Sequence, residues 1–411
     1  MKIKRYRYNS RVFYSIVDTF DCPVDPYLCA YINTSLIQKS LNTTKRYVNE
    51  LLYVVQYFNN MPDRVASGEF ISFSEFSTFF NFCCYKVNAT KDKSLFILPS
   101  TEDKNLRNIM VANQNLNIRV KPDTIQGRIR ALRKFIEWLF NKFHFGSSNE
   151  NGITDKYESL IARIILFESD LSNNQPVEVQ SIDTSIIPDD KFIELLEIIL
   201  PSSPNNPFKG SKIRNYLIVS VLIMAGIRRG ALAKLKISDC QFQGSYDEIF
   251  IYRSGIDPTE KRLDVPNQKT KSHLSVLSTE LLQHVKFYID YIRIIYPKSI
   301  THDFVFISEK DSKRTEGLPL SINSINEIFK KLSKALGIRV TAHMLRYKWN
   351  ENFDEAAEKE GIDSKRKEDI RKYEMGWVEK SKMNQKYNEK SLHKHARKIH
   401  IAHQERINKQ R

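Results

Sequence analysis

The chain has 411 residues, which is enough for two or three domains with hydrophobic cores of their own. It carries 64 Lys and Arg against 48 Asp and Glu, and the resulting formal charge of +16 favours a polyanionic partner such as nucleic acid. A membrane is disfavoured as the partner, because the sequence shows no amphipathic anchor, no lipidation signal and no apolar run of spanning length.

The cysteines also exclude some classes of protein. They are Cys22, Cys29, Cys83, Cys84 and Cys240. They form no C-x-x-C pair and have no histidine at the spacing of a zinc site, so we expect reduced thiols and no metal site. The opening segment is basic and lacks the apolar core of a signal peptide, which favours a cytoplasmic protein.

Helical periodicity organises the first half of the chain. One helix is expected after Asn42 and Thr43, with an apolar stripe made of Val48, Leu51, Leu52, Val55 and Phe58. A second is expected after Pro122 and Asp123, with inward side chains Ile125, Ile129, Leu132, Ile136, Leu139 and Phe143. The opposite side of this second helix carries Arg128, Arg130, Arg133 and Lys134. Such a basic stripe is typical of a solvated face, and it also suits a helix that lies against a DNA backbone.

The second half follows a segment that loses periodicity and gathers Asn, Ser, Pro and Asp, so we place a linker at 176–190. Helices are expected over 192–199 and 216–224, and again from Thr279, Ser324 and His343. Weak alternation at 249–252 and 274–277 predicts a small antiparallel sheet. The expected fold is therefore mostly α, with this sheet in the second domain.

Two motifs of the second half carry chemistry suited to phosphate. In AGIRRGALAKLKISD, Gly226 ends an apolar helix and Arg228 follows, so one guanidinium can project from an anchored turn. An arginine fork matches two phosphate oxygens. In TAHMLRYKW, His343 and Arg346 are three residues apart and share a helical face. Histidine can move a proton at neutral pH while a neighbouring arginine stabilises negative charge.

In their order, these segments resemble the signature boxes of the tyrosine recombinase family over about residues 186–388. The first motif resembles the first box and gives Arg228, with Asp239 as its closing aspartate. QKTKSHLSVL is similar to the β-hairpin that carries the family's lysine, with Lys269 as the better match and Lys271 as the alternative. The remaining boxes give His343, Arg346, Trp377 and the nucleophile Tyr387.

The resemblance implies a domain organisation and a set of DNA contacts. An amino-terminal extension (1–30) would precede a helical core-binding domain (31–175) that clamps DNA. An α+β catalytic domain (191–390) and a basic tail (391–411) would follow the linker. The DNA contacts expected outside the boxes are Lys45, Arg46, Arg128, Arg130, Arg133, Lys134 and Lys271. The tail would either dock on a neighbouring protomer or remain a frayed terminus.

The resemblance further implies a site-specific recombinase or integrase of a mobile element that works at the nucleoid on double-stranded DNA. It would cleave through a 3′-phosphotyrosine without metal, ATP or another cofactor. It would act as a tetramer when two sites are joined, together with accessory recombination proteins. Two alternatives use the same fold: a type IB topoisomerase, and a DNA-binding regulator that has lost catalysis. A metal-dependent nuclease would be recognised by its loss of activity in excess chelator.

Three positions depart from the family's pattern. Ala231 stands where the family usually has Glu, so the usual support of the first arginine has to come from elsewhere. Trp377 replaces the usual second histidine and has an indole N–H but no titratable group. The interval from Trp377 to Tyr387 is about one residue longer than is common in the family, which affects the register of the nucleophile.

Overall fold

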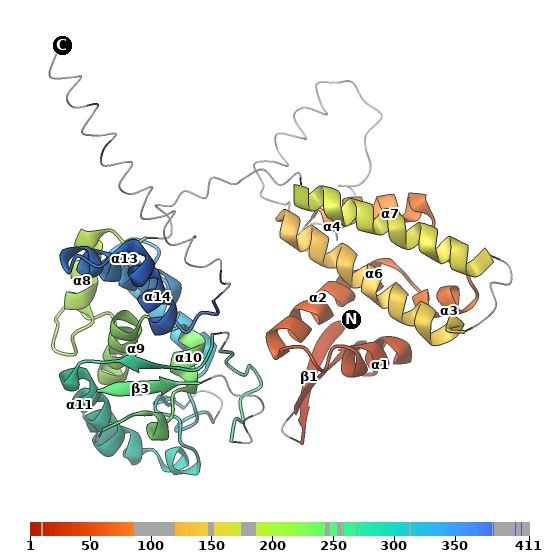
Figure 1. Ribbon diagram of the computed structural model, residues 1–411. Helices are drawn as coiled ribbons and strands as arrows, with labels where there is room; N and C mark the ends of the chain where they lie inside the picture. The colour runs from red at the N-terminus through yellow and green to blue at the C-terminus, as the bar shows by residue number, and fades with distance from the viewer. Residues whose placement is uncertain are drawn as a thin grey trace, which may run out of the picture. The chain divides into compact units, whose positions relative to one another are not determined.

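The computed structural model describes residues 1–9, 11–85, 120–146, 152–173, 186–242, 247–252, 257, 259–268, 270–311, 314–379, 381, 399 and 404. The chain divides into two units, Met1–Glu178 and Val179–Arg411, and each has its own hydrophobic core (Figure 1). The described residues are mostly helical, as predicted, and form a two-stranded antiparallel sheet in each unit. Most of the predicted linker lies outside the described residues.

The first unit opens with a β-hairpin that the sequence analysis did not predict. β1 (Lys2–Tyr8) pairs antiparallel with β2 (Arg11–Val17), and Asn9 adopts a positive φ of 44° at the turn. The inward side chains Val12, Tyr14 and Ile16 of β2 join the core of the helices. The segment expected as an extension therefore contributes to the core of the first unit.

The helices of the first unit are α1 (Pro26–Thr34), α2 (Leu41–Tyr57), α3 (Met61–Ala66), α4 (Phe73–Cys83), α6 (Pro122–His144) and α7 (Ile153–Asn173). The two predicted helices are α2 and α6, which pack on each other through fully buried side chains such as Leu51 and Leu132. α2 begins at Leu41 because Ser40, and neither of the predicted residues, caps it. The Ser40 hydroxyl accepts a hydrogen bond from the backbone N–H of Thr43.

The basic side of α6 is used largely inside the protein. Arg128 is 7% exposed, and its guanidinium donates to the carbonyl oxygens of Cys83 and Tyr85 at 2.6 and 2.7 Å. Arg133 donates to Glu168 on α7 at 2.6 Å. Because α4 and α7 also pack on α6, the side opposite its apolar stripe is not open to solvent at these two arginines. We therefore leave Arg128 and Arg133 out of the DNA surface, contrary to the sequence-based expectation.

The helices of the second unit are α8 (Asp189–Ile198), α9 (Lys212–Ala225), α10 (Arg229–Lys234), α11 (Thr279–Phe287), α12 (Ile322–Leu336), α13 (Ala342–Lys359) and α14 (Ser364–Glu374). The predicted sheet is confirmed as β3 (Glu248–Ile251) paired antiparallel with β4 (His273–Val276). Short helical turns occupy Ile237–Asp239 and the stretch from Tyr288 to Thr301. α9 is apolar on nearly all sides, and it packs against α11, α13 and β4 at the centre of this unit.

Gly226 ends α9 in the left-handed conformation, with φ of 58°, under close neighbours. A β-carbon at this position would lie 2.7 Å from Cγ of Trp349 and 2.9 Å from Cε of Met375. Gly337 ends α12 with a similar φ of 68°, but nothing lies within 4 Å of its hypothetical β-carbon. The two glycines therefore share a backbone requirement and differ in the space around them.

Gly226→Ala should destabilise the second unit more than Gly337→Ala does. Both alanines carry the left-handed penalty of about 1–2 kcal/mol, and only Gly226→Ala adds a steric overlap worth roughly 1–3 kcal/mol. Hydrogen exchange of α9 and α13 peptides in increasing urea would measure the difference. Equal losses in the two variants would contradict the close packing at Gly226.

Candidate active site

Arg228 lies at the turn between α9 and α10. After Gly226 reverses the chain, Ile227 is buried at 1% exposure and fixes the turn against the core. Arg228 then adopts an extended conformation as the residue before α10, and its side chain is half-buried. The local sequence thus places a guanidinium beside a rigid helix end, as the first motif predicted.

α13 carries the second motif. Thr341 caps this helix, because its hydroxyl accepts a hydrogen bond from the N–H of Met344. His343 is exposed in the first turn, and its ring centroid lies 4.7 Å from that of Tyr347. Arg346 is one turn further along the helix and is only 2% exposed. The predicted pair therefore combines an exposed imidazole with a buried guanidinium.

Arg346 joins the separate motifs through backbone carbonyls. Its Nη1 donates to the carbonyl oxygen of Gly226 at 2.7 Å, and its Nη2 donates to that of Met375 at 3.4 Å. The guanidinium carbon also lies 5.8 Å from the centre of the Trp377 ring. The turn before Arg228, helix α13 and the turn after α14 thus meet at one side chain.

A pocket opens beside Arg228 and Arg346, between α10, α12 and α13, and its lining is cationic. It is lined by Arg228, Arg229, Asn326, Phe329, Lys330, Ser333, Arg339, Val340, Thr341, Ala342, His343 and Arg346. Five of these residues are Arg or Lys, and none is Asp or Glu. In such a setting an anion gains charge-assisted hydrogen bonds without meeting a repelling carboxylate. The structure therefore brings Arg228, His343 and Arg346 together around a site suited to phosphate.

Three of the pocket's cations were missed by sequence reasoning. Arg229 donates to the side-chain oxygen of Asn326 at 2.5 Å, so it bridges α10 and α12 at the rim. Lys330 comes from α12, and Arg339 from the segment between α12 and α13. Arg339 stands two residues before the second motif, and this proximity is the only feature of the sequence that points to Arg339. The contribution of α12 depends on tertiary packing alone.

Trp377 lies in the turn that follows α14, and Lys271, just before β4, is hydrogen-bonded to the same turn. Trp377 is 6% exposed and packs with Tyr347 and Met375. The N–H of Lys271 donates to the carbonyl oxygen of Gly376 at 2.8 Å. This bond joins the segment before β4 to the residue that precedes Trp377. Lys269 and Tyr387 were also predicted as site residues, and both lie outside the described residues.

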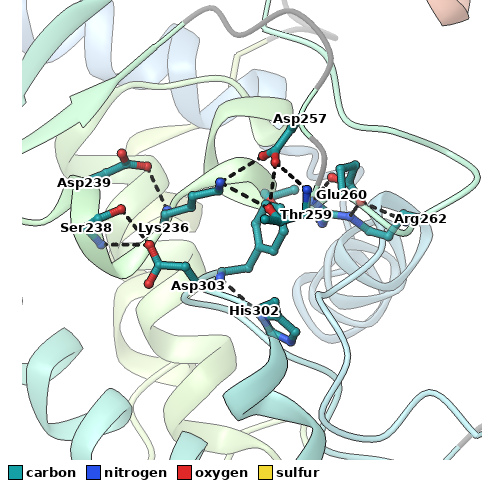
Figure 2. A network of polar contacts seen from close by, with 11 residues as sticks. Lys236, Ser238, Asp239, Asp257, Thr259, Glu260, Arg262, His302 and Asp303 are labelled. Atoms are coloured by element: carbon teal, nitrogen blue, oxygen red, sulfur yellow. Dashed lines mark hydrogen bonds and ion pairs between the residues drawn. The ribbon is translucent and has the colours of Figure 1, made fainter. Parts of the chain in front are cut away.

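The end of the first motif forms a separate polar network (Figure 2). The ammonium of Lys236 lies 3.0 Å from the carboxylate of Asp257, and its backbone N–H donates to Asp239 at 2.9 Å. Burial raises the pKa of Asp239 to about 6, although its hydrogen bond to the backbone of Lys236 works in the opposite direction. Ser238 donates to Asp303 at 2.6 Å. Asp239 thus fixes the chain after α10 and does not line the pocket.

The remaining predicted DNA contacts of the first unit are accessible. The side chains of Arg46, Lys134 and Arg130 are 61%, 46% and 34% exposed, and each contacts a less exposed carboxylate, as Arg46 does Glu50 at 3.5 Å. Lys45 is exposed as well, and it lines a depression between α2 and α6 together with Arg46. These four side chains are open enough to solvent to meet a polyanion.

Within the described ranges, no group of three or more His, Cys, Asp and Glu side chains is arranged to hold a metal ion. Over the same ranges, none of the helices combines the length and the hydropathy that crossing a bilayer requires.

Known proteins are similar to this chain mainly in the region that carries the motifs. The phage integrase family matches residues 194–391, which include the pocket and every box. Transposase A from transposon Tn554 of Staphylococcus aureus is 28% identical over 134 residues, which are 33% of this chain and 34% of the transposase. The chain thus spans about a third of the length of the curated relatives it matches.

Two solved structures of low sequence identity cover most of the chain. A lambda integrase dimer bound to a COC′ core site has 14% identity and a TM-score of 0.45, and covers 88% of this chain and 93% of that chain. XerH recombinase bound to a palindromic difH substrate has 14% identity and a TM-score of 0.43, and covers 87% and 95%. Residues 194–391, just under half of the chain, thus form a domain that is similar to the phage integrase family.

Proposed function

We propose that this protein is a site-specific DNA recombinase that cleaves and rejoins strands through a covalent 3′-phosphotyrosine. The observation that carries the proposal is the cation-lined pocket where Arg228 and Arg346 meet, inside a domain that is similar to the phage integrase family. Two forked guanidiniums suit the non-bridging oxygens of one phosphate. The nucleophile Tyr387 is assigned by sequence resemblance, because it lies outside the described residues.

The proposed chemistry gives each site residue one task. The phenolic oxygen of Tyr387 forms a bond to phosphorus, and the bond from phosphorus to the 5′ oxygen breaks. The phenolic proton passes to His343, which is exposed in the pocket, and the leaving 5′ oxygen takes a proton from Lys269. Arg228 and Arg346 stabilise the negative charge of the pentacoordinate transition state. Trp377 packs and donates, but transfers no proton.

The proposal extends to partners and setting. The phosphotyrosine keeps the energy of the broken bond, so the reaction as proposed needs neither ATP nor a metal. Rejoining to a second duplex requires a second protomer, and we propose a tetramer on double-stranded DNA, with accessory recombination proteins, at the nucleoid. The first unit acts as the DNA clamp through Lys45, Arg46, Arg130 and Lys134. Integration or excision of a mobile element is the proposed biological role.

DNA binding should weaken steeply with salt, because each phosphate that the protein neutralises releases counterions. Each such contact contributes about −0.9 to the slope of log affinity against log salt. Charge-removing Arg46→Gln and Lys45→Gln should each reduce the slope, whereas Arg128→Gln should change stability instead, because Arg128 is buried on carbonyls. Fluorescence titration of duplex DNA at several salt concentrations would measure this. A flat response in the wild type would argue against the phosphate clamp.

Tyr387→Phe should abolish covalent capture of DNA and leave binding nearly unchanged, because it removes only the nucleophilic oxygen. Incubation with a nicked duplex in the presence of chelator, followed by denaturing electrophoresis, would reveal the adduct. Tyr373→Phe is the matched control, since Tyr373 is an exposed tyrosine at the end of α14. An adduct from the Tyr387→Phe protein would identify another nucleophile. No adduct from the wild type would favour a DNA-binding regulator.

Lys269→Ala should slow cleavage about 10²- to 10⁴-fold, the usual scale for the loss of a general acid. A 5′-bridging phosphorothiolate should restore the rate, because a thiolate leaves without a proton. Arg346→Ala should remain impaired on both substrates, since sulfur does not replace charge stabilisation. Rescue of Lys271→Ala and not of Lys269→Ala would transfer the role to Lys271. Rescue of neither would show that the proton donor lies elsewhere.

A further inference from the structure

His273 is a buried titratable residue near the pocket that the proposed mechanism does not use. It begins β4, and it is only 9% exposed. Its Nδ1 lies 3.0 Å from the carbonyl oxygen of Lys271. Because a carbonyl only accepts, Nδ1 carries the proton of the neutral ring, and Nε2 holds a lone pair. This buried Nε2 has no hydrogen-bond partner in the part of the chain that the structure describes.

The imidazole packs directly on the turn that ends α14. A β-carbon at Gly376, where φ is 60°, would lie 2.4 Å from Nδ1 and 2.9 Å from Cε1 of His273. The Lys271 N–H donates to the carbonyl oxygen of this same glycine at 2.8 Å. His273 therefore contacts both partners of the hydrogen bond that attaches the segment before β4 to the Gly376 turn.

The same turn is attached to the pocket on its other side. Met375, which precedes Gly376, accepts the hydrogen bond from Arg346. Two residues further along β4, the Ser275 hydroxyl donates to the carbonyl oxygen of Ala225 at 3.3 Å, just before Gly226. The inward side chains of β4 thus reach both turns that Arg346 joins. A change at His273 would move the lysine segment relative to the arginines.

The charge state of the ring fits a positioning role. Burial lowers the pKa of His273, the hydrogen bond to the Lys271 carbonyl opposes this, and the nearby charges of Arg346 and Arg228 lower it further. The ring is therefore neutral at neutral pH and adds no positive charge to those of the two guanidiniums. Its contribution is the direction of its hydrogen bond, and not an electrostatic attraction for DNA.

We propose that His273 is a positioning residue that holds the Lys271 segment in register with the Gly376 turn. This inference rests on the proposed function, because it concerns the segment that carries the candidate proton donor. Packing alone does not explain a histidine here, since a buried acceptor without a partner costs stability that an apolar ring would not. The hydrogen bond to the Lys271 carbonyl is the feature that an apolar ring would lose.

Two substitutions of His273 in the full chain separate the hydrogen bond from the volume of the ring. His273→Phe keeps the ring and removes the hydrogen bond. His273→Asn is smaller, but its Nδ2–H can donate from the place of Nδ1. Each variant is given a nicked duplex with an ordinary or a 5′-bridging phosphorothiolate scissile bond. The rate of covalent adduct formation and the affinity for DNA are measured on both.

His273→Phe should form the adduct about 10²-fold more slowly on ordinary DNA, the scale expected when a reacting group is displaced by about 1 Å. Its DNA affinity should be unchanged, and the phosphorothiolate should restore its rate, because only proton donation is displaced. His273→Asn should keep most of the wild-type rate on ordinary DNA. A merely structural role would lower binding and slow the two substrates alike.

Several outcomes would overturn the assignment. These are a wild-type rate for His273→Phe on ordinary DNA, equal impairment on the two substrates, or a loss in His273→Asn as large as in His273→Phe. If His273→Phe does not fold, the His273→Asn result decides alone. Absence of an adduct from the wild-type protein on either substrate would refute the proposed function together with this inference. That failure is distinct, because it does not depend on a substitution at His273.

Discussion

The second unit is organised by the two hydrogen bonds that the Arg346 guanidinium donates to the carbonyl oxygens of Gly226 and Met375. The acceptors are 120 and 29 residues away in the chain, so no local preference could bring them together. A guanidinium at 2% exposure has lost most of its hydration, and carbonyl acceptors must replace it. The burial of this one charge therefore requires both turns to stand where they do.

This constraint explains why glycine occupies both turns. Trp349 and Met375 pack onto Gly226, and the His273 ring packs onto Gly376, in each case closer than a β-carbon would permit. Both glycines also have positive φ, a conformation that residues with a β-carbon rarely adopt. At Gly226 the close packing brings Arg228 to the pocket that Arg346 also lines. At Gly376 it brings the Lys271 segment to the turn before Trp377. The geometry of the pocket thus follows from the space left at two positions.

The sequence predicted the parts of this site whose signals are local. The pairing of His343 with Arg346 follows from helical spacing, and the position of Arg228 at a turn follows from a glycine that ends an apolar helix. The role of Arg128 was wrongly expected, because a basic stripe looks the same whether solvent or neighbouring carbonyls face it. Its burial depends on the carbonyls of Cys83 and Tyr85, which are more than 40 residues away in the chain. Lys330 of α12 was not predicted for the same reason, because only tertiary packing brings it to the pocket.

The N-terminal hairpin was missed for a different reason. Its two strands are neighbours in the chain, but their sequence shows only a weak strand pattern. The strand over Arg11–Val17 alternates only partly, since Tyr14, Ser15, Ile16 and Val17 are all buried. A strand that is covered on both faces loses the alternation of apolar and polar residues. Without this alternation, the short segment was interpreted as an amino-terminal extension. Lys4 of β1 forms an exposed ion pair with Asp21, and no sequence pattern predicts such a pair.

The distribution of charge, more than its total, determines where an anion is held. Away from the pocket, some cations are matched by carboxylates, as Arg262 is by Glu260 and Lys236 is by Asp257, whereas the buried Arg128 donates to carbonyl oxygens. Arg346 donates to two carbonyl oxygens, which carry no net charge and therefore leave the charge of the guanidinium in place. Lys330 does meet Glu327, but both are exposed, and such a surface pair contributes little. The lining of the pocket therefore holds five Arg and Lys side chains and no carboxylate, which suits an anion such as phosphate whose oxygens can accept hydrogen bonds.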